Sequence, residues 1–248
     1  MVPQPEMSRQ EMIAAQALVA GLTKLSSCAT HDLLGPLHRS ASLLALFVKR
    51  YRSRLDQEAD HLLEFLASAS TSMEGVAAGA QKYMEIAARA PSIGPVDLNA
   101  SLTCSLVQLE KPISASGAII VSDSLPTVLA DADHMVTLFE TLIDNSIKFR
   151  RPDVPPRIQV SSVSESDLRA ITIADNGIGI DPEYRDTVFL PFKRLNGAKY
   201  PGAGLGLAVA KLVAELYGGN IRIDSDRAFE PSPSGTRIQF TVRTIETK

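Results

Sequence analysis

The chain has 248 residues and a net charge of −3, with 45% hydrophobic and 21% charged residues. This balance excludes a disordered chain and supplies apolar material for two modest domains. The small acidic net charge gives no basis for nucleic-acid binding. No run approaches the ~20 apolar residues that span a bilayer, and the N-terminus lacks the features of a signal peptide. We therefore expect a cytoplasmic chain without membrane insertion.

The first 90 residues predict a helical hairpin. Apolar residues recur every three or four positions from Leu18 to Leu55, and again from Ala59 to Ala87. The second stripe alternates strictly between steps of three and four, which is a heptad seam. A turn is expected near Ser53–Gln57. Two narrow stripes do not close a core, so we predict that two hairpins pair into a four-helix bundle, which makes the protein a homodimer.

Residues 91–248 predict an α/β domain, separated from the hairpin (1–90) by the breaker-rich segment Ala90–Pro95. Serines dominate Ser161–Asp167, which predicts a hairpin loop. Strands are expected near Ile119–Val121, Thr127–Leu129, Arg157–Val163, Ala170–Ala174, Asn220–Ile223 and Thr236–Val242. Helices are expected near Leu98–Ser114, Asp131–Phe149 and Gly204–Tyr217.

One histidine lies on the polar side of the first helix. His31 is two residues from both Ala29 and Leu33, about 200° around the helix from the apolar stripe. A neutral imidazole is a competent nucleophile, and the adjacent Asp32 is placed to take its second proton. Pro36 follows, and a proline inside a helix produces a kink. A solvent-facing His–Asp pair is also a common surface feature, so the hypothesis requires a site that phosphorylates His31.

Two segments of the second half predict a nucleotide site. Asn145 and Lys148 share one face at the end of a helix, where an amide oxygen suits Mg²⁺ and an ammonium group neutralises phosphate. Asp175 ends a strand and is followed by Gly177 and Gly179. A carboxylate there can accept a hydrogen bond from the amino group of adenine, and a buried reader of this kind discriminates strongly. Asp-Asn-Gly is equally a common turn sequence.

A third segment is rich in glycine and precedes a helix. Gly202, Gly204 and Gly206 allow backbone N–H groups to approach phosphates, with the helix N-terminus behind them. The segment is not a Walker loop, because no Gly-Lys-Ser/Thr follows. It also lacks the preceding strand of a Rossmann fingerprint.

Taken in order, these motifs resemble a known family. The Asn145 segment, Asp175-x-Gly177-x-Gly179, Phe189-x-x-Phe192 and Gly202-x-Gly204-x-Gly206 are similar to the ATP-binding domain of histidine kinases, Hsp90 chaperones, type II topoisomerases and MutL proteins. The segment from His31 to Leu37 resembles the phosphoacceptor box of histidine kinases alone. Runs such as Ile147–Arg150 are similar to those of the phytochrome-like branch. The resemblance covers about residues 22–244.

The resemblance implies an α+β chain: a dimeric four-helix bundle followed by a Bergerat α/β sandwich with a mixed sheet and a mobile lid over ATP. It implies that Asn145 holds Mg²⁺ and that Asp175 reads adenine, with Thr236 nearby. Phe189 and Phe192 are expected to pack at the base of the lid, about residues 195–203. The remaining ATP-binding residues it implies are Lys148, Gly177, Gly179, Gly202, Gly204 and Gly206. The implied activity is autophosphorylation on His31, with Asp32 as base, and phosphotransfer to the receiver domain of a response regulator.

Three features depart from the family pattern. Thr141 stands where kinases often have a further asparagine, which puts the catalytic rate in doubt more than binding. Gly35 stands where relatives carry a polar residue that helps to dephosphorylate the regulator, so strong phosphatase activity is not expected by that route. No sensor domain is recognised in the first 20 residues, so the input is expected from sequence beyond this chain or from a separate sensor protein.

Two other functions compete with this hypothesis. A catalytically weak ATP-binding scaffold or histidine phosphotransferase would use the same dimer, and Thr141 favours it. A pure relay, however, has no need of the Asn145 and Asp175 motifs. An ATP-gated clamp of the chaperone or topoisomerase type would need neither the His31 box nor the hairpin.

Overall fold

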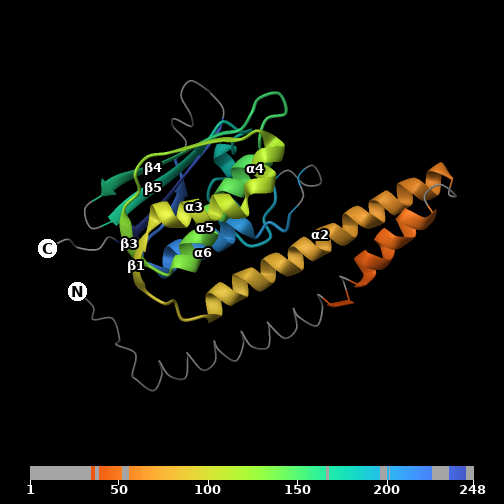
Figure 1. Ribbon diagram of the computed structural model, residues 1–248, viewed down its shortest axis with the longest axis horizontal. Helices are drawn as coiled ribbons and strands as arrows, with labels where there is room; N and C mark the ends of the chain where they lie inside the picture. The colour runs from red at the N-terminus through yellow and green to blue at the C-terminus, as the bar shows by residue number, and fades with distance from the viewer. Residues whose placement is uncertain are drawn as a thin grey trace, which may run out of the picture. The chain divides into compact units, whose positions relative to one another are not determined.

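The chain forms two compact units, Met1–Arg89 and Ala90–Lys248, in the computed structural model (Figure 1). The assignment of phosphoacceptor and ATP-binding roles to the two parts of the chain remains a prediction. The described residues are 35–36, 39–51, 56–165, 168–195, 200, 202–224 and 235–243.

The first unit is helical where it is described. Residues 39–51 are α-helical, and α2 extends over Gln57–Ala88. Asp56 caps the start of α2, since its carboxylate accepts a 2.8 Å hydrogen bond from the Ala59 amide. His31 and Asp32 lie outside the described residues, as does most of the turn expected near Ser53–Gln57. No helix in the described parts of the chain is long and apolar enough to cross a membrane.

The second unit is built on a mixed five-stranded sheet with the order β2-β4-β5-β7-β6. Among the described strands of this sheet, β2 and β4 pair in parallel and the other neighbours pair antiparallel. A separate antiparallel pair joins β1 and β3. The strands are β1 (Gly94–Asp97), β2 (Ile119–Ser122), β3 (Thr127–Ala130), β4 (Arg157–Glu165), β5 (Leu168–Asp175), β6 (Ile221–Ile223) and β7 (Thr236–Arg243).

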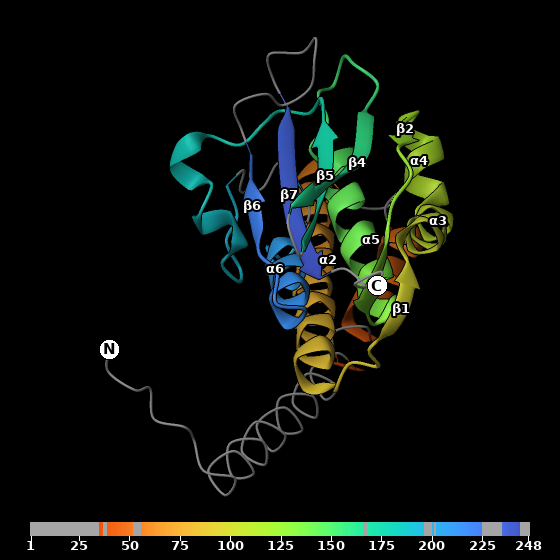
Figure 2. The same cartoon turned by 90° about the vertical axis from the view of Figure 1, so that its left-hand side faces the viewer.

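Helices gather on one face of this sheet (Figure 2). The α-helices are α3 (Leu98–Gln108), α4 (Glu110–Ser116), α5 (Ala132–Lys148) and α6 (Gly206–Leu216), and the 3-10 helices are η2 (Pro182–Tyr184) and η3 (Thr187–Phe189). α5 packs against both α3 and α6. Phe139 of α5 meets Phe240 of β7 edge to face at 6.0 Å, and both rings are fully buried. Such a pair adds directional contact to apolar burial, so it fixes α5 on the sheet.

The α+β class with a mixed sheet is confirmed, and each expected strand is present. The structure differs from expectation in three places. Gly94–Asp97 is the strand β1 rather than a linker, because it finds a partner in β3. The expected helix Leu98–Ser114 breaks at Leu109, which leaves Pro112 in the first turn of α4, where its missing N–H costs nothing. The expected loop at Ser161–Asp167 is mostly strand, since β4 pairs with β5 as far as Glu165.

Candidate functional site

A buried aspartate ends the central strand of the second unit. Asp175 is the last residue of β5 and is 7% exposed. Its Oδ1 accepts hydrogen bonds from the Gly177 amide at 2.9 Å and from the Thr236 amide at 3.0 Å. Its Oδ2 lies 3.0 Å from the Ser146 hydroxyl of α5. The carboxylate therefore joins β5, the turn after it, β7 and α5 at one point.

The surroundings of Asp175 set its chemistry. Burial raises the pKa of the Asp175 carboxyl, and the hydrogen bonds from Gly177, Thr236 and Ser146 lower it in part. A carboxylate offers about four acceptor positions. Three donors among the described residues occupy three of them, which leaves one for an external donor. Such a group can read an amino group on a ligand.

The glycines beside Asp175 allow close backbone approach. A β-carbon on Gly177 would lie 2.6 Å from the Phe149 carbonyl oxygen, which accepts a 3.0 Å hydrogen bond from the Ile178 amide. A β-carbon on Gly235 would collide with the Asp175 carbonyl oxygen. Gly179 has a φ of 79°, a backbone that side chains disfavour. The turn after β5 therefore packs directly on the end of α5.

The end of α5 meets the start of α6. A β-carbon on Gly206, the first residue of α6, would lie 3.3 Å from Thr141 Cγ2 and 3.5 Å from Asn145 Nδ2. Asn145 is half-buried, and Ser146, which follows it, contacts Asp175. The structure thus brings Asn145 to the N-terminus of α6, where free backbone N–H groups favour an anion.

Lys148 lies one helical turn beyond Asn145, and its ammonium group abuts Gly202. Loss of solvent lowers the pKa of Lys148; nearby Asp144 raises it, and Arg194 lowers it again. Lys148 is half-buried and Arg194 is exposed, and two cations that repel each other favour an anion between or beside them. Gly202 has a φ of 142°, in the range that favours glycine.

Aromatic rings lie beside Lys148. The Phe149 ring centroid is 5.0 Å from Lys148 Nζ and 5.0 Å from the Tyr200 ring. Arg194 donates a 3.0 Å hydrogen bond to the Tyr200 carbonyl oxygen. Tyr200 is thereby held against the end of α5.

Two phenylalanines, Phe189 and Phe192, were expected to pack at the base of the lid, and they differ in burial. Phe189 is buried, whereas Phe192 is 56% exposed and has a φ of 63°. The expectation that Phe192 packs there is wrong. A β-carbon on Gly204 would lie 2.7 Å from the Lys193 carbonyl oxygen, so this backbone folds closely on itself.

Comparisons with known proteins place these features in a family. Residues 130–246 match the family described as Histidine kinase-, DNA gyrase B-, and HSP90-like ATPase. Cyanobacterial phytochrome A of Nostoc sp. is 33% identical over 90% of this chain, and the phytochrome-like protein Cph1 of Synechocystis sp. is 31% identical over 84%. The chain spans 28% of the length of each of these two relatives. Residues 130–246 belong to this ATPase family, and the chain as a whole resembles the transmitter core of a sensor histidine kinase near the phytochrome branch.

Solved structures agree with this family. A mycobacterial sensor histidine kinase, MprB, is 29% identical with a TM-score of 0.52, over 61% of this chain and 97% of that chain. Full-length ShkA in complex with AMPPNP is 19% identical with a TM-score of 0.63, over 90% of this chain and 46% of that chain. The latter likeness shows the fold of the transmitter core alone.

Sequence reasoning missed three residues of this transmitter core. Ser146, Phe149 and Arg194 each contact a predicted site residue or lie beside one. The sequence signal for Ser146 was only its place next to Asn145. Arg194 carried a charge beside the glycine-rich segment, which could have suggested a second phosphate contact.

Proposed function

We propose that this transmitter core uses ATP to phosphorylate His31 and then passes the phosphoryl group to an aspartate on a response-regulator receiver domain. The observation that carries the proposal is the buried Asp175 carboxylate, with one acceptor position left, beside the α5 end that bears Asn145 and Lys148. The family match supports the same activity.

Asp175 would accept a hydrogen bond from the 6-amino group of adenine. A base without an amino group at this place leaves a buried carboxylate position unpaired, which costs affinity. Gly177 and Gly179 would give the base flat access to the turn, because neither carries a side chain. Thr236 would hold Asp175 in place through its amide, which donates to Oδ1.

The phosphates would lie toward the junction of α5 and α6. Backbone N–H groups at Gly206 would face them, with Gly202 and Gly204 letting the chain approach closely. Lys148 and Arg194 would neutralise their charge, which would also relieve the repulsion between the two cations.

Asn145 would supply one amide oxygen to Mg²⁺. No group of three or more His, Cys, Asp or Glu residues suited to a metal occurs among the described residues. This donor set fits Mg²⁺, which keeps several waters and takes few protein ligands beside substrate phosphates. When bound, the ion neutralises charge on the phosphates.

The transfer itself would fall to the first unit. An imidazole nitrogen of His31 would attack the γ-phosphorus, the bond to the β–γ bridging oxygen would break, and ADP would leave. Asp32 would accept the proton from the other ring nitrogen. In the second step, a carboxylate of the receiver domain would attack the phosphorus and the N–P bond would break. The proton held by Asp32 would return to the ring, so that neutral imidazole is released.

The second copy of the chain would cover the seam of α2. Apolar side chains of this seam are exposed in one chain: Leu62 at 60%, Leu66 at 53%, Met73 at 52% and Val76 at 39%. A heptad stripe with this exposure favours knobs-into-holes packing with other helices. We therefore propose a homodimeric four-helix bundle built from two hairpins.

Incubation of the purified chain with γ-labelled Mg-ATP tests the activity. We expect label that is acid-labile and alkali-stable, as a phosphorylated histidine is. His31→Gln should abolish the label, and His38→Gln serves as a control histidine on the same segment. Absence of label from a chain that binds ATP would favour the scaffold or relay alternative instead.

A further inference from the structure

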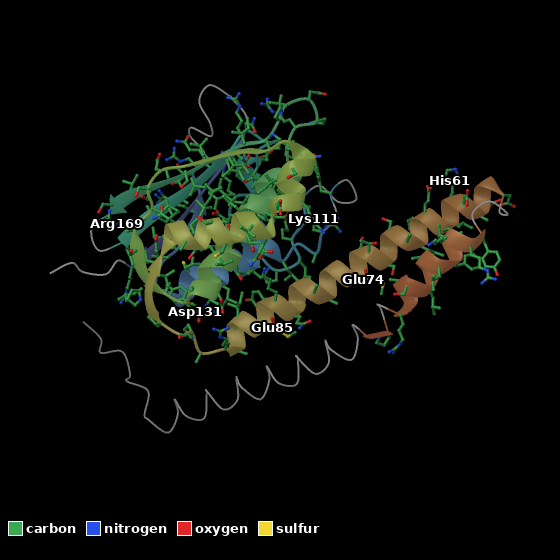
Figure 3. All side chains as sticks on the ribbon, viewed as in Figure 1. His61, Glu74, Glu85, Lys111, Asp131 and Arg169 are labelled. Carbon is green, nitrogen blue, oxygen red and sulfur yellow. The ribbon has the colours of Figure 1, made fainter. Side chains whose placement is uncertain are left out.

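A buried polar cluster ties together the other ends of the two helices that form the site. Asp131 is the N-cap of α5, and Tyr217 is the C-cap of α6. They are 2% and 5% exposed, and His134 of α5 is 3% exposed. The Tyr217 hydroxyl accepts a 3.1 Å hydrogen bond from the Asp131 amide and lies 2.8 Å from His134 Nδ1. Asp131 is labelled in Figure 3.

The same cluster holds the linker, residues 90–93, which lies between the C-cap of α2 and β1. Asp131 Oδ2 accepts a 2.8 Å hydrogen bond from the Ser92 amide, while its Oδ1 accepts a 3.0 Å bond from the Asp133 amide. Ser92 comes shortly after Arg89, the C-cap of α2. One buried carboxylate therefore caps α5 and binds the linker at once.

The two helices pack together and meet at both ends. Asn145 of α5 lies near Gly206 of α6 at the nucleotide end, and Asp131 is bonded to Tyr217 at the other. Packed helices behave as rigid elements, because their interface has native packing density. A change in the hydrogen bonding at Tyr217 must therefore also alter the position of Asn145 relative to the start of α6.

We propose that Ser92, Asp131, His134 and Tyr217 form a linker latch that sets the geometry of the nucleotide site. This inference rests on the proposed function, since it assigns regulation to the same site. While the latch is closed, the linker is fixed to α5 and α6. Tension on the linker would reach the nucleotide through the two helices. Tyr217 is a positioning residue in this arrangement, and it contacts no substrate.

Tyr217→Phe opens the latch with the least disturbance. The ring, whose centroid is 6.0 Å from that of His134, is kept, and only the hydroxyl is lost. The Asp131 amide and His134 Nδ1 then lose their contact with this hydroxyl while they remain buried. The matched control is Ser105→Ala, which deletes another buried hydroxyl, bonded to the Leu102 carbonyl oxygen on α3.

Two measurements on the full chain test the latch. Calorimetric titration with a non-hydrolysable ATP analogue and Mg²⁺ should show affinity reduced between about twofold and thirtyfold in Tyr217→Phe. Amide hydrogen exchange without nucleotide should speed up at Ser92 and also at residues 145–149. Ser105→Ala should change neither quantity by as much.

Equal affinity in Tyr217→Phe and wild type, or an equal loss in Ser105→Ala, would overturn the latch. Faster exchange confined to Ser92 would overturn it as well. If wild-type chain binds no nucleotide, the proposed function fails, and exchange at residues 145–149 alone decides on the latch. If Tyr217→Phe does not fold, Ser92→Pro removes the linker donor while keeping the three buried side chains, and the same outcomes apply.

Discussion

The Ser146 hydroxyl lies 3.0 Å from Asp175 Oδ2 and so links the end of α5 to the end of β5. Ser146 directly follows Asn145, so the proposed metal-binding and base-reading residues are separated by one peptide bond and one hydrogen bond. The same hydroxyl lies 3.1 Å from the Leu142 carbonyl oxygen. One proton serves two acceptors, and an ionised Asp175 competes for it more strongly.

Ser146→Ala should weaken nucleotide binding at low pH. The Ser146 bond helps to lower the pKa of Asp175, which burial raises, so its loss should raise that pKa further. If binding needs the ionised carboxylate, the pH below which affinity falls should move upward. At neutral pH the loss should reach about tenfold at most. Titrations across pH 5 to 8 (about one unit apart) check this, with Ser105→Ala as control; superimposable profiles would contradict it.

Asp175→Asn should lose nucleotide binding while association through α2 persists. The substitution replaces one of the two acceptor oxygens of the side chain with a donor nitrogen. Where that nitrogen faces the base, the adenine amino group meets no acceptor. Calorimetry measures the first property and light scattering the second. Normal ATP binding by this variant would rule out the proposed reading of adenine.

A comparison of the wild type with Asp175→Asn should show how ionisation of Asp175 changes the unfolding free energy with pH. Because the pKa of Asp175 is raised in the folded chain, the folded state holds its proton more tightly than the unfolded state. This group therefore lowers stability as pH rises from the ordinary aspartate pKa through the raised one. Relative to Asp175→Asn, the wild type should lose unfolding free energy across that window. Urea unfolding at several pH values measures the difference, and a flat difference would count against the raised pKa.

Gly177→Ala should destabilise the second unit and impair nucleotide binding. Its β-carbon would lie 2.6 Å from the Phe149 carbonyl oxygen, so the turn or the end of α5 must move. We expect a loss of about 1–3 kcal/mol in unfolding free energy. Gly94→Ala is the control, since nothing lies within 4 Å of its added carbon. Equal stability of the two variants in denaturant melts would refute the close approach.

Lys148→Met should separate phosphate binding from base binding. Affinity for ATP should fall by about tenfold or more, because a charge-assisted contact is lost, while affinity for adenosine stays the same. The ATP affinity of the variant should also depend less on salt than that of the wild type. Titrations with both ligands at two salt concentrations measure this. A parallel loss for adenosine would place Lys148 at the base instead.

Leu66→Lys should dissociate the proposed dimer. Leu66 lies on the heptad stripe of α2 and is 53% exposed in one chain, so the substitution would bury a charge at the seam. Ser68→Lys places the same charge on an exposed position off the stripe. Sedimentation should show monomer for the first variant and dimer for the second. A dimeric Leu66→Lys chain would exclude the α2 seam as the interface.

Local patterns in the sequence were enough to predict most elements. Alternation and branched residues located each strand of the five-stranded sheet, because side chains alternate between faces with period two. The end of a strand placed Asp175, and spacing within one helical turn placed Asn145 beside Lys148. The strand β1 was not predicted, because Gly94 and Pro95 are residues typical of loops. It forms a strand because β3 provides its hydrogen-bonding partner.

The sequence by itself determined which chemical groups stand at the ends of which elements, because helix and strand periods are local properties of the chain. Only the tertiary structure decided which of those groups meet. Ser146 and Asp175 are 29 residues apart, Ser92 and Asp131 are 39 apart, and Asp131 and Tyr217 are 86 apart. Such contacts depend on how α5 and α6 pack on the sheet, and packing is set by the whole core rather than by any one segment.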